Sequence, residues 1–351
     1  MKRIISIVLT VALAATLFVG CSCGQDKKID KEAGYDVDKY IKLGKYTGFE
    51  YDIDQKKFDD MLADKTYEAT EVSRAAKMGD EIEFSYTGYI KDKKVKDLSQ
   101  DSIAAETDQK DNAVYLKFTN ELIGKKKGDT ATVKLSGKEA SKISNTNKKY
   151  TDDVTFKLKV KEVSEVNHPK VTNDWVKNES NEDVETADEF FQVIETELDD
   201  AAMADVWQMA VDKATMTSWP PKLYNKVKEE EEADANYNAD QWDMSLEEYY
   251  AMNGDTKESL EKEYMNQVKS TLVMWEIVKE EDINVSAKEI EQRYNDLYVE
   301  LKDDDEVKTL ADVKKKYSKA EIKEAVYLEK AQKFVYKNST IKKTYKIHNN
   351  K

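Results

Sequence analysis

The sequence predicts an α+β fold, in which a small antiparallel sheet domain is followed by an extended all-α part. Over roughly residues 40–166 apolar and polar residues alternate with a period of two, whereas over roughly residues 170–345 apolar residues recur with the helical period of 3.6. Only 3 Pro and 11 Gly occur in 351 residues, which favours long uninterrupted elements, mainly helices, over a loop-rich β fold. Strands first and helices second is the order of an α+β chain, not of a doubly wound α/β chain.

The charge and the scarce residue types limit the chemistry. The chain has 71 Asp and Glu against 56 Lys and Arg, a formal net charge of −15, which excludes a nucleic-acid partner because little would neutralise the phosphates. It has only two His and two Cys, so the sequence predicts no metal site and no cofactor.

The first 20 residues are expected to be a signal peptide. Two basic residues precede an apolar stretch that is too short for a comfortable transmembrane span. A small residue before Cys21 resembles the processing site of bacterial lipoproteins. We therefore expect cleavage before Cys21 and lipidation of its sulfur, which would hold the protein at the outer face of a bacterial membrane. Cys23 is the alternative lipidation position. A redox or metal-binding Cys21–Cys23 pair is the competing interpretation, although one intervening residue gives poor disulfide geometry.

The stretch between the anchor and the sheet domain divides in two. Residues 21–38 are polar and charged, and they predict a flexible tether. Residues 39–74 predict a short strand–helix segment, because Phe49, Tyr51 and Ile53 alternate with acidic residues before apolar residues at helical spacing.

The sheet domain is expected over residues 75–166. The strictest alternation of apolar and polar residues lies at 81–87 and 154–161, after turn signals or polar stretches. Such alternation predicts an antiparallel sheet with one covered and one solvated face. Residues 97–112 and 137–153 are polar and are expected to be loops.

Three segments of this domain, at 79–89, 118–129 and 154–163, resemble FKBP-type peptidyl-prolyl isomerases in their order and spacing. The resemblance implies a twisted antiparallel sheet wrapped on one short helix, with an apolar pocket between sheet, helix and loops. The resemblance implies that the catalytic set in this pocket is Tyr86, Phe118 and Phe156. It implies that the substrate-binding set is Val95, Val114, Tyr115 and Tyr150.

An apolar pocket of this kind suits prolyl isomerisation. Amide rotation has a barrier of about 18–20 kcal/mol because of C–N resonance, and an apolar wall that binds the twisted amide better than the planar one lowers it. Two departures from the family stand out. Val95-Lys96 replaces Phe-Asp, with Asp97 one residue late, and residues 136–140 replace the flap aromatic, leaving only Tyr150 nearby. A peptide-binding domain with weak or no activity is therefore the alternative, and core aromatics of an ordinary β domain are the plainest interpretation.

The helical part is expected over residues 167–345. Capping boxes at Thr186, Ser245, Ser286 and Ser318, each with Glu three residues later, mark helix starts. The order of its segments resembles the C-terminal chaperone domain of bacterial trigger factor, notably at 169–172, 219–223, 245–249 and 281–290. The family's ribosome-docking domain has no counterpart here, so a ribosome-bound role is not expected.

These features together predict a lipid-anchored extracytoplasmic folding factor. It would bind unfolded or newly exported polypeptides in its helical arms and isomerise X-Pro bonds in the FKBP-like domain. The alternative is a holdase chaperone whose FKBP-like domain is catalytically degenerate. A solute-binding or surface lipoprotein ranks last, because solute-binding lipoproteins show βαβ alternation.

Overall fold

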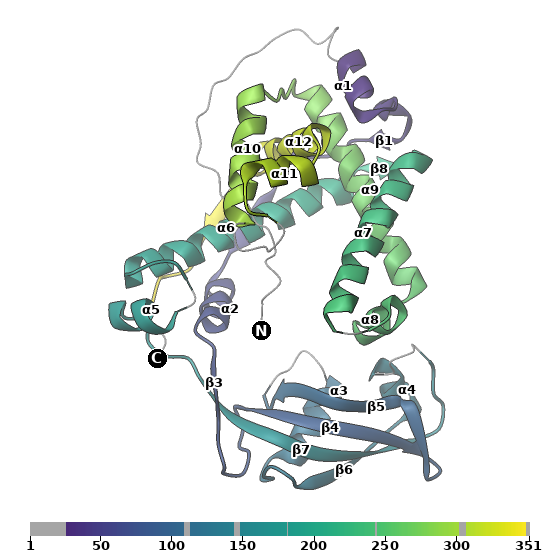
Figure 1. Cartoon of the computed structure of the whole chain (residues 1–351), viewed down its shortest axis with the longest axis vertical. Coiled ribbons are helices and arrows are strands. Elements are labelled where there is room, and N and C mark those ends of the chain that lie inside the picture. The colour runs from purple at the N-terminus through teal and green to yellow at the C-terminus, as the bar shows by residue number, and fades with distance from the viewer. Residues whose placement is uncertain are drawn as a thin grey trace. The chain divides into compact units, whose positions relative to one another are not determined.

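The computed structural model describes residues 26–108, 113–143, 148–180, 182–242, 244–301 and 307–348. The signal peptide, Cys21 and Cys23 lie outside these residues. The chain divides into two compact units. The first contains residues up to 59, 191–229 and 263–347, and the second contains residues 60–190 and 230–262. The predicted α+β class is confirmed, since a small antiparallel sheet is followed by a long helical part (Figure 1).

The sheet lies in the second unit and is antiparallel throughout. Its strands follow the order β3-β7-β4-β5, with β6 paired to β7 as well. The strands are β3 (Glu68–Glu71), β4 (Asp80–Ile90), β5 (Lys93–Glu106), β6 (Thr130–Leu135) and β7 (Val154–Asn167). Helix α3 (Ala113–Leu122) follows β5, the short helix α4 (Gly137–Ala140) follows β6, and α5 (Asn173–Glu179) follows β7.

The alternation in the sequence becomes the two faces of this sheet. On the inner face Tyr86 pairs with Leu158 and Gly88 with Phe156, while Val133 of β6 flanks Phe156 on its other side. The inner residues of β4 and β7 and the apolar residues of α3 form one core cluster. The outer residues of β7, such as Lys157 and Lys159, are exposed. The sheet therefore has one covered face and one solvated face, as alternation requires.

Two stretches expected to be loops contain regular structure. Residues 97–106 belong to β5, which pairs with β4 from Lys93 to Glu106. Residues 137–143 form α4 and a 3₁₀ turn (Ser141–Ile143). Strand β5 is polar because it lies at the edge of the sheet, where most side chains meet water, and its pairing partner rather than its own pattern determines its structure.

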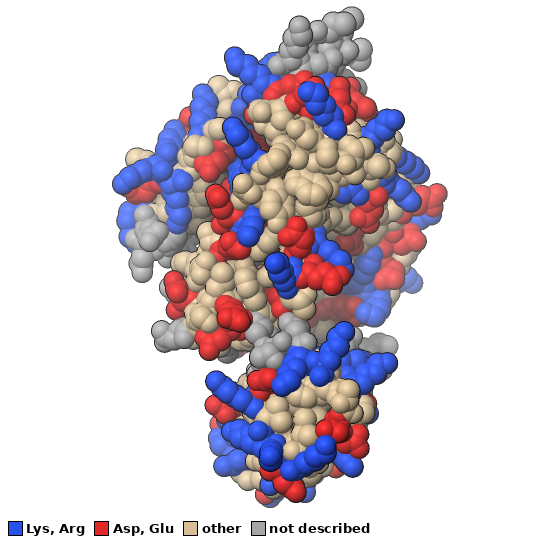
Figure 2. All heavy atoms as spheres, turned by 90° about the vertical axis from the view of Figure 1, so that its right-hand side faces the viewer, with Lys and Arg blue, Asp and Glu red and all other residues tan. Residues whose placement is uncertain are grey.

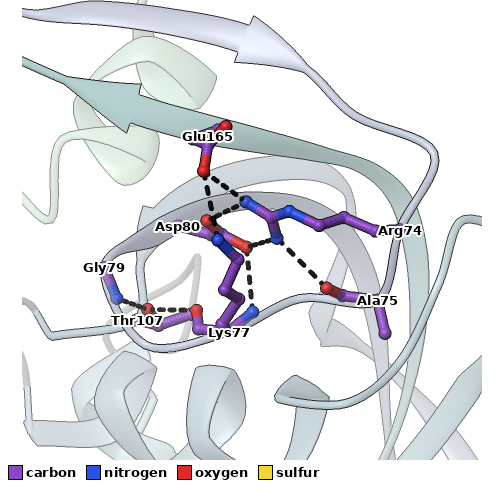
Figure 3. A network of polar contacts seen from close by, with 7 residues as sticks. All are labelled: Arg74, Ala75, Lys77, Gly79, Asp80, Thr107 and Glu165. Atoms are coloured by element: carbon purple, nitrogen blue, oxygen red, sulfur yellow. Dashed lines mark hydrogen bonds and ion pairs between the residues drawn. The ribbon is translucent and has the colours of Figure 1, made fainter.

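A polar network connects the loop before β4 to the start of β4 and to β7. The Arg74 guanidinium contacts both carboxylate oxygens of Asp80, at 2.5 and 2.9 Å, and one oxygen of Glu165 on β7, at 3.1 Å (Figure 3). The backbone N–H of Lys77 also donates to Asp80, at 2.8 Å. Asp80 is buried, and the hydrogen bond from Arg74 holds its pKa below the usual range. A buried carboxylate supplied with this many donors stays ionised and pins the loop to the sheet.

The helical part runs from α6 to α12 and ends in a short strand. Its elements are α6 (Ala187–Lys213), β8 (Thr215–Met216), α7 (Pro221–Gln241), α8 (Leu246–Met252), α9 (Lys257–Glu280), α10 (Ala287–Glu300), α11 (Leu310–Lys316), α12 (Lys319–Lys337) and β9 (Thr340–Lys343). The expected capping boxes at Thr186, Ser245, Ser286 and Ser318 form, and a further one at Thr309 begins α11. Among the described residues, no helix is both long and apolar enough to cross a membrane.

The segment before the sheet is built into the first unit. It contains α1 (Asp26–Ala33), a 3₁₀ turn (Val37–Lys39), β1 (Ile41–Lys42), β2 (Glu50–Ile53) and α2 (Gln55–Lys65). Strand β1 pairs with β8, and β2 lies parallel to β9, about 290 residues further along the chain. Ile29 and Val37 are fully buried. The prediction of a flexible tether over residues 21–38 is therefore wrong for its described part, which is helical in part and forms the ion pairs Glu32–Lys323 and Asp38–Lys279 with residues distant in sequence.

Candidate functional site

Three aromatic rings meet at the centre of the sheet domain. Tyr86 comes from β4, Phe118 from α3 and Phe156 from β7. The ring centroids are 5.4 Å apart for Tyr86 and Phe118, 5.8 Å for Tyr86 and Phe156, and 5.1 Å for Phe118 and Phe156. Their tilted and edge-on arrangement is the favourable one for aromatic pairs. The structure thus brings the predicted catalytic set together.

The three rings are interior residues. Tyr86 is 1% exposed, and Phe118 and Phe156 are not exposed at all. They belong to the core cluster that also contains Ile82, Phe84 and Leu158. A ring that catalyses amide rotation must touch the substrate, so a substrate could reach this set only if the side chains around it move.

Gly88 is what allows this close packing. A Cβ on Gly88 would lie 2.7 Å from the Cβ of Leu98, 2.9 Å from the carbonyl oxygen of Leu98 and 3.1 Å from the Phe156 ring. These distances are too short for any side chain without displacement of its neighbours. The glycine therefore lets β5 and the Phe156 ring approach the same point of β4.

The Tyr86 hydroxyl has its own partners inside the domain. It donates to Oε1 of Gln100 on β5, at 3.1 Å. Burial raises the pKa of Tyr86, with a smaller contribution from Tyr115, so the phenol stays protonated. Asp97, which stands one residue late relative to the family pattern, does not bind this hydroxyl but accepts a hydrogen bond from Tyr150, at 3.1 Å.

The predicted substrate-binding residues lie at the margin of the aromatic cluster. Val95, Tyr115 and Tyr150 are partly exposed and pack against the core, whereas Val114 is 3% exposed and belongs to it. Tyr150 is held from two sides, because its backbone N–H donates to Oγ of Ser141, at 2.7 Å, and its hydroxyl to Asp97. The bond between Asp97 and Tyr150 joins β5 to the loop before β7. The sequence analysis singled out both residues but did not predict this bond.

A hollow in the described part of the sheet domain lies on the face opposite the aromatic cluster. It has a volume of about 330 Å³ and is lined by polar residues of β4, β6 and β7 and their turns, namely Tyr89, Lys91, Asp92, Lys134, Asp153, Thr155 and Lys157. The Lys157 ammonium lies 4.8 Å from the centre of the Tyr89 ring. This hollow is hydrophilic and does not contain the aromatic cluster, so it differs from the apolar pocket that the family resemblance implies.

A second surface feature lies on the helical hairpin of α7 and α8. Tyr237 is 67% exposed, Trp242 is 61% exposed and Met252 is 44% exposed. Tyr237 lies on α7, Trp242 directly after the end of α7, and Met252 at the end of α8, so three large apolar side chains of this region are accessible to a partner. Methionine adapts its shape to different partners. Within the described residues, no group of His, Cys, Asp and Glu is arranged to hold a metal ion.

Comparisons with known proteins support the trigger factor family. Residues 185–337 match the family model described as bacterial trigger factor protein (TF) C-terminus. The trigger factor of Streptococcus mutans is 24% identical over 283 residues, which are 75% of this chain and 65% of that protein. The trigger factor of Caldanaerobacter subterraneus is 23% identical over 296 residues, 78% of this chain and 66% of that protein. The chain thus spans just under two thirds of the length of these relatives.

A solved structure described as "Promiscuous Substrate Recognition in Folding and Assembly Activities of the Trigger Factor Chaperone" is also similar. The alignment covers 85% of this chain and 72% of that chain, at 15% sequence identity and a TM-score of 0.33.

Proposed function

We propose that this protein is a folding factor that binds unfolded, newly exported polypeptides outside the cytoplasm. The observation that carries the proposal is the exposure of the Tyr237 and Trp242 side chains, which lie within the stretch matched by the trigger factor C-terminal model. An unfolded chain exposes the apolar side chains that a native protein buries, so an apolar surface selects unfolded over folded partners.

Suppression of aggregation tests this function. A chemically denatured client is diluted into buffer with or without the full chain, and light scattering is followed. We expect the chain to reduce scattering, and the double variant Tyr237→Ser/Trp242→Ser to lose most of that effect. Val299→Ser/Ile347→Ser is the matched control, because both side chains are exposed but lie on other elements. If the wild-type chain leaves scattering unchanged, the proposal is wrong.

A prolyl isomerase activity is the second candidate function. It is favoured by the convergence of Tyr86, Phe118 and Phe156 next to the partly exposed Tyr115 and Tyr150. No nucleophile or metal is needed, since a twisted amide is favoured by an apolar environment alone. The complete burial of the three rings favours instead the alternative, a chaperone whose sheet domain is catalytically degenerate.

A proline-peptide assay decides between these two. We expect any activity of the wild type to fall at least about tenfold in Phe156→Ala, which removes the closing-strand ring. Tyr86→Phe leaves the ring and removes the hydroxyl that Gln100 accepts from, so it tests the polar contribution alone. Activity that neither substitution changes would show that the site is elsewhere. Absence of activity in the wild type, with aggregation still suppressed, would establish the degenerate alternative.

The location of the protein is a further part of the proposal. The basic and apolar start of the sequence, followed by Cys21, supports a lipid anchor at the outer face of a bacterial membrane. Membrane fractionation of Cys21→Ser against Cys23→Ser tests it. We expect the first variant to leave the membrane fraction and the second to stay, whereas release of only the second would assign the lipid to Cys23.

A further inference from the structure

One end of the sheet domain carries a group of lysines. It is the end at which β4 stops and β7 starts, and it receives residues from the start of β5, from α4 with its 3₁₀ turn, and from the loop before β7. We call this group the lysine collar, which consists of Lys93, Lys94, Lys96, Lys138, Lys142, Lys148 and Lys149.

Hydrogen bonds and an ion pair show that these three segments lie at the same end of the domain. The Tyr150 hydroxyl donates to Asp97 of β5, and the Tyr150 backbone donates to Ser141 after α4. The Lys91 ammonium in the β4–β5 turn lies 3.0 Å from Asp152 before β7. The collar is therefore set around Tyr150, at one edge of the aromatic cluster.

Four of the acidic residues at this end have a partner within the domain, whereas Asp92 in the β4–β5 turn is exposed. Asp97 accepts from Tyr150, Asp152 pairs with Lys91, and Asp153 pairs with Lys134 at 3.3 Å. Glu139 pairs with Lys117 and caps α4. In contrast, the collar lysines make no ion pair with any carboxylate of the described residues, and all seven are exposed. Lys96 and Lys149 are close enough to Glu248 and Glu258 to help lower the pKa of these two carboxyls, whereas the other five lysines leave this end with an excess of positive charge.

The excess of lysine in the sheet domain contrasts with the net negative charge of the whole chain. Residues 75–166 hold 18 Lys against 16 Asp and Glu, whereas the complete chain has 15 more acidic than basic residues. Figure 2 shows blue side chains outnumbering red ones on the visible face of the sheet domain, at the bottom of the view.

Apolar contact area lies among these charges. Val95 is partly exposed and shares its face of β5 with Lys93, two residues earlier in the strand. The Lys148 ammonium is 5.4 Å from the centre of the partly exposed Tyr150 ring. A ligand that places an apolar residue on Val95 and Tyr150 would therefore set its neighbouring residues beside the collar lysines.

We propose that this end of the sheet domain binds unfolded polypeptide segments in which acidic residues flank an apolar or X-Pro element. The proposal rests on the proposed function, since it names the class of segment that the sheet domain takes. Each exposed ion pair between a collar lysine and an acidic residue of the peptide contributes little binding energy. Several lysines within one Debye length, about 10 Å at 0.1 M salt, together favour acidic peptides, and added salt removes this preference.

Three labelled peptides test this preference. They share the core Ala-Leu-Pro-Phe-Ala and are flanked on both sides by Glu-Glu, Gln-Gln or Lys-Lys. Fluorescence anisotropy with the full chain at about 50 mM KCl is expected to show the Glu peptide binding about tenfold tighter than the Gln peptide, with the Lys peptide weakest. At about 500 mM KCl the three affinities should converge.

A pair of charge-reversal variants locates the effect. Lys93→Glu/Lys148→Glu alters the collar beside Val95 and Tyr150 and should abolish the advantage of the Glu peptide. Lys126→Glu/Lys159→Glu makes the same change in net charge at exposed positions away from this end and should preserve the advantage. Equal binding of the Glu and Gln peptides, or an unchanged preference in the collar variant, overturns the inference. If no peptide binds but aggregation is still suppressed, the inference fails while the proposed function stands; if suppression is absent too, both fail.

Discussion

Replacing Glu276 with Gln should stabilise the protein at alkaline pH and leave its stability unchanged at acidic pH. Glu276 lies on α9 beside Lys279, which is 8% exposed and contacts Asp38 of the N-terminal segment at 2.5 Å. One carboxylate oxygen of Glu276 is buried with no hydrogen-bond partner in the described part of the chain. Burial, and then the charge of Asp38, raise the pKa of Glu276 to about 7.

The sign and size of the effect follow from that pKa. Between the usual pKa of 4.5 and about 7, the native state holds a proton that the unfolded state releases, so stability falls as the pH rises through this window. At 1.36 kcal/mol per pKa unit, the rise corresponds to at most about 3 kcal/mol. Because the side chain is only partly buried, water screens it, and we expect about 1 kcal/mol at pH 8 or so. The neutral amide of Gln avoids this penalty and can still donate to Asp38.

Urea unfolding of both proteins at about pH 4 and about pH 8 measures the difference. We expect Glu276→Gln to be more stable than the wild type by about 1 kcal/mol at the higher pH and equal to it at the lower pH. Glu247→Gln, an exposed position on α8, is the matched control and should change neither value. A Gln variant that is less stable at both pH values, or equally stabilised at both, would refute the reasoning.

Three further substitutions test the packing. Phe58→Ala should destabilise the first unit by about 3–5 kcal/mol in urea unfolding, because Phe58 is fully buried and its ring centroid lies 5.1 Å from that of Tyr345, on which it stacks. A cost below about 1 kcal/mol would mean that the N-terminal segment is not part of this core. Gly88→Ala should cost about 1–3 kcal/mol and alter the near-ultraviolet circular dichroism, since its Cβ would lie 2.7 Å from Leu98; a neutral result would contradict the close approach. Asp80→Asn should lower the free energy of unfolding by about 1–3 kcal/mol at neutral pH, and this difference from the wild type should vanish as the pH falls through the lowered pKa of Asp80. A difference that does not depend on pH would exclude the ionised carboxylate as the cause.

The elements that the sequence predicted well are those fixed by local chemistry. The capping boxes at Ser286 and Ser318 form as expected, because each needs only a hydroxyl and a carboxylate three residues apart. The alternation at 154–161 placed the inner face of β7 correctly for the same reason, since side chains alternate across a strand regardless of its partners.

The elements that it missed are those fixed by distant partners. Ile29 is surrounded by charged residues in the sequence, and nothing local shows that it is buried in the first unit. The parallel pairing of β2 with β9 and the edge position of β5 also depend on partners that pattern reasoning does not see.

The same distinction between local and distant determinants applies to the candidate site. Family resemblance implied that Tyr86, Phe118 and Phe156 would share one pocket, and the rings do converge. Their complete burial could not be inferred, because burial depends on how α3 closes against the sheet. The bond from Tyr150 to Asp97 depends on loop geometry between segments more than 50 residues apart.

The most direct test of the central claim is the affinity of the full chain for one client in its unfolded and native forms. A small disulfide-bonded protein that stays unfolded when reduced and alkylated provides both forms from the same sequence. Fluorescence anisotropy should show saturable binding of the unfolded form and at least about tenfold weaker binding of the native form, because only the unfolded form exposes its apolar residues. Equal affinity for the two forms, or no binding of either, would contradict the claim that this protein is a folding factor for unfolded polypeptides.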